Sequence, residues 1–507
     1  MSLPGLSDDG RWHLPKRLNM AAQCLEHPKD KIAIVEINRR DRHEVTYGEL
    51  GAMVDDVARA LLTSIRAGDR VGVLLSQSAW CAAAHLAIWK IGAISVPLFK
   101  LFRSEALRSR IDNAGCQIVL TDSEGELLLK GLAQSWLINQ VGQSGEPIAY
   151  AETSPDSPAI LIYTSGTTGQ AKGALHGHRV LTGHIPGVYL SHNHLGIADD
   201  MLWTPADWAW IGGLFDVLMV GLALGVPVIA ARFDKFTPEL CVELIGSAGI
   251  RNIFFPPTAL KILKAANQKI SGLRSVAAGG EPLGKEMLQW GQEAFGLNIN
   301  EFYGQTECNM FVSSCAEEFS PKAGCIGKVV PGFTVDVIDA NGNPTTAEGD
   351  IAVRKGAAAM MLSYWGRPKE TEAKYRNEWL VTGDRGIWDG EFLRFLGRED
   401  DVITSGGYRI GPAEIEDCLL THPDVENVGV VGKPDPTRTE IVKAYVVCKA
   451  GRQPLADELQ DWVKQRLASY SYPREIAFIN ELPMTVTGKV VRKVLKDQAI
   501  SEAECGE

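Results

Sequence analysis

Residues 160–173 read Ile160-Leu161-Ile162-Tyr163-Thr164-Ser165-Gly166-Thr167-Thr168-Gly169-Gln170-Ala171-Lys172-Gly173. The apolar run at the start predicts a buried strand, and the glycines after it predict a loop. Glycines let backbone N–H groups approach a polyphosphate closely, hydroxyls donate further hydrogen bonds, and a lysine adds positive charge. The stretch therefore predicts a phosphate-binding loop, and a polar surface turn between two core segments is the alternative.

The P-loop pattern GxxxxGK[ST] is the obvious comparison for this loop. Lys172 falls where the P-loop lysine would be, but Ala171 replaces the preceding glycine. Gly173 replaces the Ser or Thr that would hold Mg²⁺. These two departures disfavour an ordinary P-loop NTPase or kinase.

Length and composition restrict the class of protein. A chain of 507 residues exceeds what one hydrophobic core usually serves, so we expect at least two domains. The net charge of -11 argues against a nucleic-acid binder. The ten cysteines form no CxxC pairs, which indicates neither a zinc site nor a disulfide framework and fits a reducing cytoplasm. The longest apolar run, residues 217–231, is short and interrupted by glycines and Pro227, so we predict buried core rather than a membrane span.

Short aliphatic strands alternate with helical periodicity through the first part of the chain. Residues 32–35, 71–75 and 94–98 are typical of strands, and residues 50–65 and 80–91 of helices. This alternation predicts an α/β fold with parallel sheets covered on both faces by helices. A charged break at residues 397–403 predicts a domain boundary, followed by a small α+β domain.

Further polar motifs punctuate the apolar segments. Three of them are Asp207-Trp208-Ala209-Trp210, Gly279-Gly280-Glu281-Pro282 and Thr382-Gly383-Asp384. The segment Glu301-Phe302-Tyr303-Gly304-Gln305-Thr306-Glu307 combines aromatics that can stack on a base, a hydroxyl for a phosphate and a carboxylate for Mg²⁺. Near the C-terminus, Gly488 precedes Lys489 in Pro483-Met484-Thr485-Val486-Thr487-Gly488-Lys489. Taken singly, each motif also fits a core tryptophan, a local cap or a solvated surface lysine.

Taken in order, these motifs resemble the adenylate-forming superfamily of acyl-CoA synthetases, luciferases and peptide-synthetase adenylation domains. Residues 163–173 match the family pattern YTSGTTGxxKG at every specified position, and the other motifs recur in register over nearly the whole chain. The motifs are most similar to those of AMP-forming synthetases of short- and medium-chain acids. The resemblance implies a large N-terminal domain, residues 1–399, with parallel sheets, helices and a smaller β subdomain. It also implies a small mobile C-terminal domain, residues 400–507.

The resemblance also assigns roles to residues. It implies that the catalytic residues are Lys489, Thr306 and Glu307, with Glu307 also holding Mg²⁺. It implies ATP or AMP binding by Thr164, Ser165, Gly166, Thr167, Thr168, Gly169, Lys172, Gly280, Glu281, Pro282, Glu301, Phe302, Tyr303, Thr306, Asp384, Arg398 and Arg409. The acyl pocket would comprise Asp207, Trp208, Trp210 and Gly304, and coenzyme A would meet Gly406, Gly407, Tyr408 and Arg438.

The implied reaction has two halves. A carboxylate attacks the α-phosphorus of ATP to give acyl-AMP and pyrophosphate, and the thiol of coenzyme A then attacks the acyl carbon. Because Lys489 and Gly407 lie in the same small domain but serve different halves, we expect a rotation hinged at Asp400. In acetate- and propionate-specific synthetases a tryptophan precedes Gln-Thr-Glu. Gly304 therefore predicts a deeper pocket for a short- to medium-chain, branched or simple aryl acid, with acetate a poor substrate.

Other functions stay open at this point. A peptide-synthetase-type adenylation enzyme could load a carrier protein in trans, although no carrier module follows Lys496 in the sequence. A non-catalytic acyl-adenylate sensor is a third class, but it should have lost a key charge. Luciferase-like oxygenation would need a pocket that sequence does not show. The acid's identity and the oligomeric state, a homo-oligomer included, are not determined by these motifs.

Overall fold

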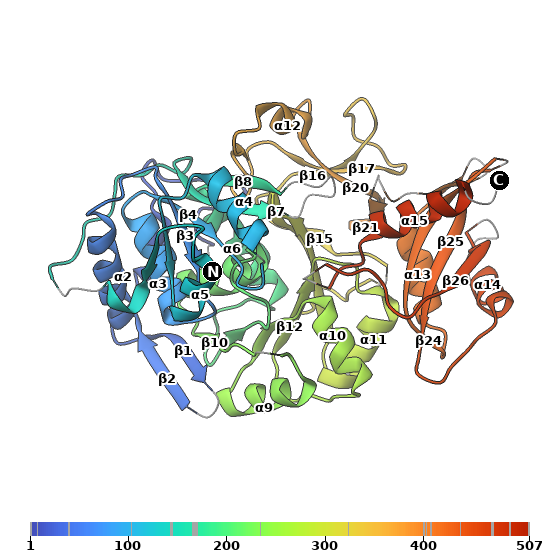
Figure 1. The fold of residues 1–507 in the computed structure, drawn as a ribbon, viewed down its shortest axis with the longest axis horizontal. Coiled ribbons are helices and arrows are strands. Elements are labelled where there is room, and N and C mark those ends of the chain that lie inside the picture. The colour runs from blue at the N-terminus through green and yellow to red at the C-terminus, as the bar shows by residue number, and fades with distance from the viewer. Residues whose placement is uncertain are drawn as a thin grey trace.

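The computed structural model describes residues 3–7, 9–38, 41–102, 104–141, 145–164, 171–233, 235–322, 324–398, 401, 403–405, 408–436, 438–467, 471–485 and 488–504, with only the backbone of residues 404, 408, 409 and 504. Figure 1 shows a large body built from the first part of the chain and a smaller one, coloured orange to red, beside it.

One sheet of the large domain contains the strand that precedes the phosphate loop. Its strands follow the order β18-β8-β7-β4-β3-β5-β6. The pairs β4–β7, β3–β4, β3–β5 and β5–β6 are parallel, while β8 and β18 add antiparallel strands at one edge. The bounds are β3 (Arg70–Leu74), β4 (Ile94–Pro97), β5 (Ile118–Thr121), β6 (Ser135–Leu137), β7 (Pro158–Thr164), β8 (Lys172–Gly177) and β18 (Ser363–Tyr364).

A second sheet of the large domain carries most of the remaining motifs. Its order is β15-β14-β13-β12-β11-β9-β10-β1-β2, parallel from β13 to β1 and antiparallel at both edges. The bounds are β1 (Ile32–Asn38), β2 (Asp41–Thr46), β9 (Leu202–Trp203), β10 (Val228–Ala230), β11 (Asn252–Phe254), β12 (Ser275–Gly279), β13 (Ile299–Gln305), β14 (Cys308–Ser313) and β15 (Lys328–Val329).

Helices surround these two sheets, as the alternation of the sequence predicts. They are α1 (Met20–Leu25), α2 (Tyr47–Leu61), α3 (Ala79–Lys90), α4 (Ser104–Ala114), α5 (Ser123–Leu129), η1 (Ile138–Gln140), α6 (Arg179–Ser191), α7 (Ile211–Gly213), η2 (Leu214–Met219), α8 (Val220–Leu224), α9 (Pro238–Ala248), α10 (Pro257–Ala265) and α11 (Gly284–Phe295). Helix α3 is buried almost all round, with Trp89 fully enclosed, because it packs between other helices and a sheet. The predicted α/β class is confirmed.

Helix α2 begins three residues before the predicted start at Leu50 for a local reason. The Thr46 side chain accepts a hydrogen bond from the backbone N–H of Glu49, and the Glu49 side chain accepts from the Thr46 N–H. This capping box satisfies two helix-end donors and therefore fixes the start at Tyr47. The apolar residues 217–231 run from η2 through α8 to the end of β10 and are mostly buried, in agreement with the prediction of core.

A third sheet completes the large domain. It pairs β16 (Val335–Ile338), β17 (Gly349–Arg354), β20 (Trp379–Asp389) and β19 (Tyr375–Arg376), with β21 (Phe392–Arg398) on β20, and α12 (Pro368–Ala373) lies just before β19. The small domain contains a fourth sheet, β23-β22-β25-β24 with β26 on β25. Its bounds are β22 (Ile403–Ser405), β23 (Tyr408–Ile410), β24 (Val425–Asp435), β25 (Thr439–Cys448), β26 (Glu475–Phe478), α13 (Pro412–Leu420), α14 (Ala456–Lys464) and α15 (Arg492–Glu504).

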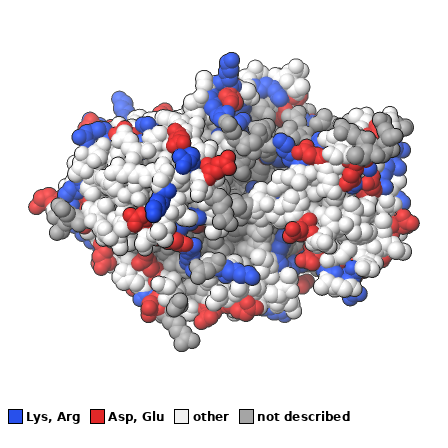
Figure 2. Space-filling view, in the orientation of Figure 1, with Lys and Arg blue, Asp and Glu red and all other residues white. Residues whose placement is uncertain are grey.

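The surface carries no large area of one charge on the face in Figure 2, where basic and acidic side chains are interspersed, and it is hollowed between the two bodies. Among the described residues, no helix is both long enough and apolar enough to cross a membrane.

Candidate active site

The predicted phosphate loop connects β7 to β8, which pair in antiparallel fashion with Thr164 opposite Lys172. The loop residues Ser165, Gly166, Thr167, Thr168 and Gly169 lie outside the described residues, so their contacts stay a prediction. Its two ends are well anchored. The Tyr163 hydroxyl donates to Asn113 Oδ1 at 2.7 Å, and Lys172 Nζ lies 5.5 Å from the centre of the Tyr364 ring.

Glu307 lies at the turn between β13 and β14, beside β8. His176 Nε2, on β8, is 2.8 Å from the carbonyl oxygen of Thr306. The Glu307 carboxylate is largely buried and accepts a hydrogen bond from the Tyr364 hydroxyl, the same residue whose ring faces Lys172. The arrangement therefore brings the predicted metal-binding carboxylate close to the predicted phosphate-binding lysine.

Tyr303, Asp384 and Arg398 meet where β13 approaches the β20–β21 pair. The Tyr303 hydroxyl donates to Asp384 Oδ2 at 2.5 Å, and Arg398 Nε lies 3.8 Å from Asp384 Oδ1. Burial raises the pKa of Asp384, while the hydrogen bond from Tyr303 and the charge of Arg398 oppose that rise. Arg398 Nε is buried and has no hydrogen-bond partner among the described residues, so this cluster retains an unused donor beside a carboxylate.

Lys374 fixes the backbone under this cluster, and sequence reasoning missed it. Its buried ammonium donates to Gln305 Oε1 at 3.0 Å and to the carbonyl oxygens of Val381 and Thr382 at 3.1 Å each. Gln305 Nε2 donates to the same Thr382 carbonyl at 3.1 Å. Burial lowers the pKa of Lys374, and the charges of Glu307 and Asp384 oppose this. The lysine thus ties the Gln305 motif to the Thr382-Gly383-Asp384 turn.

The turn after β12 holds Gly280 in a conformation that suits glycine, with φ of +99°. Glu281 pairs with Lys261 of α10 at 3.6 Å. Glu301 supports this turn from β13, because its carboxylate accepts a hydrogen bond from the backbone N–H of Leu283 at 3.2 Å. Burial raises the pKa of Glu301 to about 8. Its geometry makes it a positioning residue for the turn that also contains Pro282.

Phe302 and Tyr303 have their rings in different environments. The Phe302 ring contacts Phe254, with centroids 5.2 Å apart, and a Cβ on Gly279 would lie 2.5 Å from it. Gly279 therefore has no room for a side chain. The Tyr303 ring contacts Phe311 with centroids 4.9 Å apart. Phe302 thus packs beneath the β12 turn, and Tyr303 faces Asp384.

Lys489 of the small domain points into the same site. A tight turn carries it, in which the Thr485 N–H donates to the Lys489 carbonyl at 2.7 Å and the Lys489 N–H donates to Thr485 Oγ1 at 3.0 Å. A Cβ on Gly280 would lie 3.7 Å from Lys489 Nζ, and one on Gly488 would lie 2.2 Å from Thr258 Cγ2 of α10. The turn therefore rests directly on the large domain.

The electrostatic surroundings of Lys489 include the other predicted site residues. Its side chain keeps contact with solvent, yet enough protein encloses it that desolvation lowers its pKa. Glu281 and Asp384 raise the pKa by attraction, and Arg398 lowers it by repulsion. Glu281 and Lys489, some 200 positions apart in the sequence, therefore lie in the same charged site.

The predicted acyl wall lies where α7 begins. Asp207 Oδ1 accepts a hydrogen bond from the Ala209 N–H at 2.8 Å, and burial raises its pKa to about 6. Trp208 is fully buried, whereas the Trp210 ring contacts Phe99 and Phe102 with centroids 5.5 and 5.9 Å away. Asp207 therefore shapes the local turn, and the two tryptophans face different neighbours.

Gly304 lies at a bulge in β13, where the pairing with β14 shifts between Tyr303 and Gln305. A Cβ there would lie 2.4 Å from the Met310 backbone nitrogen and 2.5 Å from Asn309 Oδ1. Asn309 Nδ2 donates to both carboxylate oxygens of Asp216 at 2.9 Å each. Burial raises the pKa of Asp216 well above its ordinary value. A buried polar pair, which sequence reasoning missed, therefore lies behind Gly304.

The remaining predicted residues belong to the small domain and its boundary. Asp400, Gly406 and Gly407 lie outside the described residues, as do the side chains of Tyr408 and Arg409. Arg438 is exposed, and its backbone N–H donates to Asp435 Oδ1 at 2.8 Å. The predicted hinge and coenzyme A contacts therefore stay predictions.

The chain matches two family models in sequence order. The model described as AMP-binding enzyme covers residues 20–365, and that of the AMP-binding enzyme C-terminal domain covers residues 414–489. The chain therefore belongs to the AMP-binding enzyme family, as the motifs indicate. Within it, the chain is an acid–thiol ligase of the AMP-forming acyl-CoA synthetase class.

Individual relatives agree with this assignment. The chain is 31% identical to the acetyl-coenzyme A synthetase of Bacillus subtilis, covering 95% of this chain and 90% of the relative. It is 33% identical to the mitochondrial acyl-coenzyme A synthetase ACSM4 of Rattus norvegicus, covering 96% and 91%. The solved structure of o-succinylbenzoate CoA synthetase from Bacillus subtilis with its acyl-adenylate OSB-AMP superposes with a TM-score of 0.83 at 29% identity, covering 96% and 99%.

Proposed function

We propose that the constellation around Lys489 is the arrangement that forms the acyl-adenylate. The observation that carries this proposal is the approach of Lys489 Nζ to Gly280, in a field set by Glu281, Asp384 and Arg398. A carboxylate and ATP are both anionic, so the first half-reaction requires alignment and positive charge at the α-phosphoryl oxygens. Lys489 is the residue that we assign to supply that charge.

The large domain would bind the rest of ATP. Asp384 would accept hydrogen bonds from the ribose hydroxyls, and the free Nε–H of Arg398 would donate to the same sugar. Thr164 and Lys172 would hold the departing pyrophosphate from the two ends of the β7–β8 loop. Tyr303 and Thr306 would contact ATP from the segment 301–307. In the same segment, Glu301 would support the turn at Leu283 and Phe302 would pack against Phe254.

Glu307 fits a Mg²⁺ ligand because it offers carboxylate oxygens, which Mg²⁺ prefers, next to the predicted phosphate site. The Tyr364 hydroxyl and the Lys172 ammonium nearby would orient Glu307 and attract phosphate. When bound there, Mg²⁺ supplies positive charge that neutralises the leaving pyrophosphate.

For the second half-reaction we propose a rotation of the small domain about Asp400. It would withdraw Lys489 and bring Gly406, Gly407 and Tyr408 to the coenzyme A tunnel, with Arg409 near phosphate in one or both arrangements and Arg438 near the coenzyme. The boundary at residue 400 and the cytoplasmic location remain predictions from sequence. A homo-oligomer also stays open.

We propose a short- to medium-chain, branched or simple aryl acid as the substrate, bound between the Trp208–Trp210 wall and the Gly304 bulge. Two glycines, Gly212 and Gly304, face the Asp216–Asn309 pair, because a Cβ on Gly212 would lie 3.7 Å from Asp216 Oδ2. An apolar tail would gain about 0.8 kcal/mol for each buried methylene until it reached this polar pair. We therefore expect a length optimum rather than a continuous rise.

The experiment is a pyrophosphate-release assay over acetate, butyrate, hexanoate, octanoate and benzoate, with and without coenzyme A. We expect coenzyme-dependent turnover with acetate poor. Preference for acetate would contradict the substrate proposal, and turnover unaffected by coenzyme A would favour loading of a carrier protein.

A variant sharpens the test of chain length. Gly304→Trp is unsuitable alone, since even a Cβ there meets the β14 backbone. Gly212→Val instead adds volume towards Phe254 Cε1, 3.0 Å from the Cβ position, and towards Asp216. We expect the optimum to shorten by about one to two carbons, while Gly246→Ala, at a position with open space around its Cβ, should leave the length profile unchanged.

A further inference from the structure

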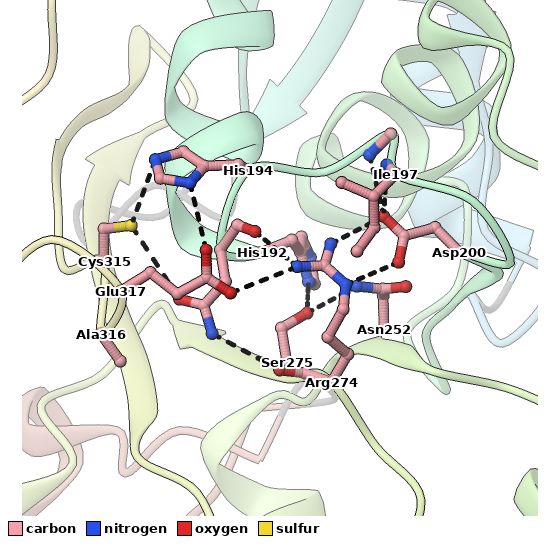
Figure 3. A network of polar contacts seen from close by, with 12 residues as sticks. His192, His194, Ile197, Asp200, Asn252, Arg274, Ser275, Cys315, Ala316 and Glu317 are labelled. Carbon is pink, nitrogen blue, oxygen red and sulfur yellow. Dashed lines mark hydrogen bonds and ion pairs between the residues drawn. The ribbon is translucent and has the colours of Figure 1, made fainter.

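A cluster of chemically different ligand groups, none of them assigned to the active site, joins two loops of the large domain. His194 follows helix α6, and Cys315, Glu317 and Glu318 follow strand β14. The ligand atoms of His194, Cys315 and Glu318 all lie within 4.8 Å of one another. Figure 3 shows the imidazole turned towards Cys315, with Glu317 beside it. Sequence alone predicted no zinc site, because His194 lies 121 positions before Cys315.

We propose that His194, Cys315 and Glu318 form a binding site for Zn²⁺ in this chain. His194 Nε2 is 2.9 Å from Glu318 Oε1 and 3.9 Å from Cys315 Sγ. Tetrahedral Zn²⁺, with bonds of about 2.3 Å to sulfur and about 2.0–2.2 Å to nitrogen or oxygen, places neighbouring ligand atoms about 3.3–3.6 Å apart. The two distances bracket that range, so small side-chain movements would complete three corners of a tetrahedron.

The other imidazole nitrogen has the partner that metal-binding histidines usually have. His194 Nδ1 lies 3.2 Å from Glu317 Oε2, and a carboxylate on the second nitrogen orients the ring towards a metal. Glu317 Oε1 in turn lies 3.8 Å from Arg274 Nη1. Arg274 is held by Asp200 through two contacts of 2.7 Å, so the outer support of the ring is itself fixed.

The two loops are connected independently of the ligand side chains. Asn300 of β13 donates to the Ser191 carbonyl at 2.9 Å and to Asn193 Oδ1 at 2.8 Å, and its own Oδ1 accepts from the Ala316 N–H at 2.9 Å. The backbone N–H of Glu318 donates to the Cys315 carbonyl at 3.0 Å, which folds Glu318 back over the thiol. The hydrogen bonds of Asn300 and of the Glu318 backbone therefore hold the two ligand-bearing loops together without using the ligand side chains.

The ligand types select among metals. Mg²⁺ and Ca²⁺ prefer oxygen alone, whereas thiolate with imidazole and carboxylate suits Zn²⁺. Cys315 is fully buried beneath the cluster, and the His194 and Glu318 side chains are 31% and 47% exposed, so the ion has a path from solvent. On binding, the Cys315 thiol releases its proton to solvent and water takes the fourth position. The bound ion would link the loop after α6 to the loop after β14.

The test uses the full-length, chelator-treated protein and Co²⁺ as a spectroscopic probe of the zinc site. We expect one equivalent to bind with near-ultraviolet sulfur-to-cobalt absorption, and Zn²⁺ to displace it and raise the Tm. Co²⁺ held by Glu307 would give no such absorption, because its protein ligands there are oxygens. Absence of the absorption in the parent would overturn the proposal.

Variants identify the ligands. Cys315→Ser should abolish the absorption, and His194→Asn, which suits the left-handed backbone at that position (φ +61°), should weaken Co²⁺ binding at least about 100-fold. Glu317→Gln should weaken it about 10–100-fold through loss of ring orientation. Cys448→Ser, in the small domain, is the matched control and should bind as the parent does. If His194 is instead a cation that bridges Glu317 and Glu318, the parent would show neither the sulfur-to-cobalt absorption nor a rise in Tm with Zn²⁺, and the proposal would be wrong.

Discussion

The large-domain part of the active site and the small-domain lysine that completes it are held in different ways. In the large domain, Asp384 accepts a hydrogen bond from Tyr303, Lys374 donates three hydrogen bonds beneath it, and Glu307 accepts from Tyr364. Lys489 Nζ has no hydrogen bond to any described residue, and its turn rests on α10 by contact. Hydrogen bonds therefore fix the large-domain half of the site. The small-domain half can move away without breaking a hydrogen bond between the Lys489 ammonium and any described residue.

We expect the largest loss of activity from a substitution of Glu307 in the large-domain half of the site. Glu307→Gln should lower acid-dependent ATP–pyrophosphate exchange about 100- to 1,000-fold, because it removes a charge that acts on the developing pyrophosphate. Exchange measured over a range of Mg²⁺ concentrations checks this. Tyr364→Phe is the control, since it keeps the carboxylate and removes only its hydrogen bond, and we expect a loss below about tenfold. Equal losses in the two variants would argue that Glu307 acts only through its bond to Tyr364.

Lys374 gives the next effect, on stability rather than on chemistry. Lys374→Met keeps the length of the side chain but removes the ammonium donor from Gln305 Oε1 and from the Val381 carbonyl. The Thr382 carbonyl loses one of its two donors and keeps the hydrogen bond from Gln305 Nε2. A buried acceptor left without a partner costs about 1–3 kcal/mol, which thermal unfolding would detect. Lys369→Met, on the exposed face of α12, should change the Tm little. A Lys374 variant as stable as the parent would show that the large-domain half is less firmly fixed than we infer.

Asp417 gives a smaller effect at the junction of the domains. This α13 residue lies against α11, where a Cβ on Gly284 would be 2.9 Å from its Oδ1. Burial, with help from the charge of Glu416, raises its pKa from 3.8 to about 7, although Lys261 opposes the shift. The folded protein thus keeps a proton there that the unfolded chain has lost. Stability from this group is present below pH 4 and is lost as the pH rises through 7.

Asp417→Asn should therefore raise the free energy of unfolding relative to the parent at pH 8, by on the order of 1 kcal/mol, and raise it by less at pH 5. The Tm should rise in the same order. Thermal unfolding of both proteins at the two pH values measures the difference. A variant whose advantage is the same at pH 5 and pH 8 would contradict the assignment of the proton to Asp417.

The class of fold predicted from sequence is confirmed, and the proposed site residues could be named from sequence because each motif consists of contiguous residues. Glycines at Gly280 and Gly488 and the β7–β8 loop are visible as local patterns. The supporting residues were missed since they act across long separations: Tyr364 meets Glu307, Lys374 meets Thr382 and Gln305, and Asn309 meets Asp216. The supporting residues Tyr364, Lys374, Asn309 and Asp216 do not lie in motifs whose composition suggests a ligand.

Gly304 illustrates the same limit. Its missing side chain was interpreted as space in the acyl pocket, but the sequence does not show where a Cβ would point. The bulge in β13 directs that position at the β14 backbone and Asn309. The depth of the pocket therefore depends on residues such as Gly212 and Asp216 as well, which only the arrangement of helix and strand brings into view.

The central claim is that Lys489 serves the first half-reaction from an arrangement it later leaves, and Lys489→Ala tests it most directly. Acid-dependent ATP–pyrophosphate exchange and thioester formation from supplied acyl-adenylate should be measured on the same preparation. We predict that exchange falls about 100- to 1,000-fold, corresponding to about 2.7–4 kcal/mol, while thioester formation is largely retained. Equal loss in the two half-reactions would contradict the claim.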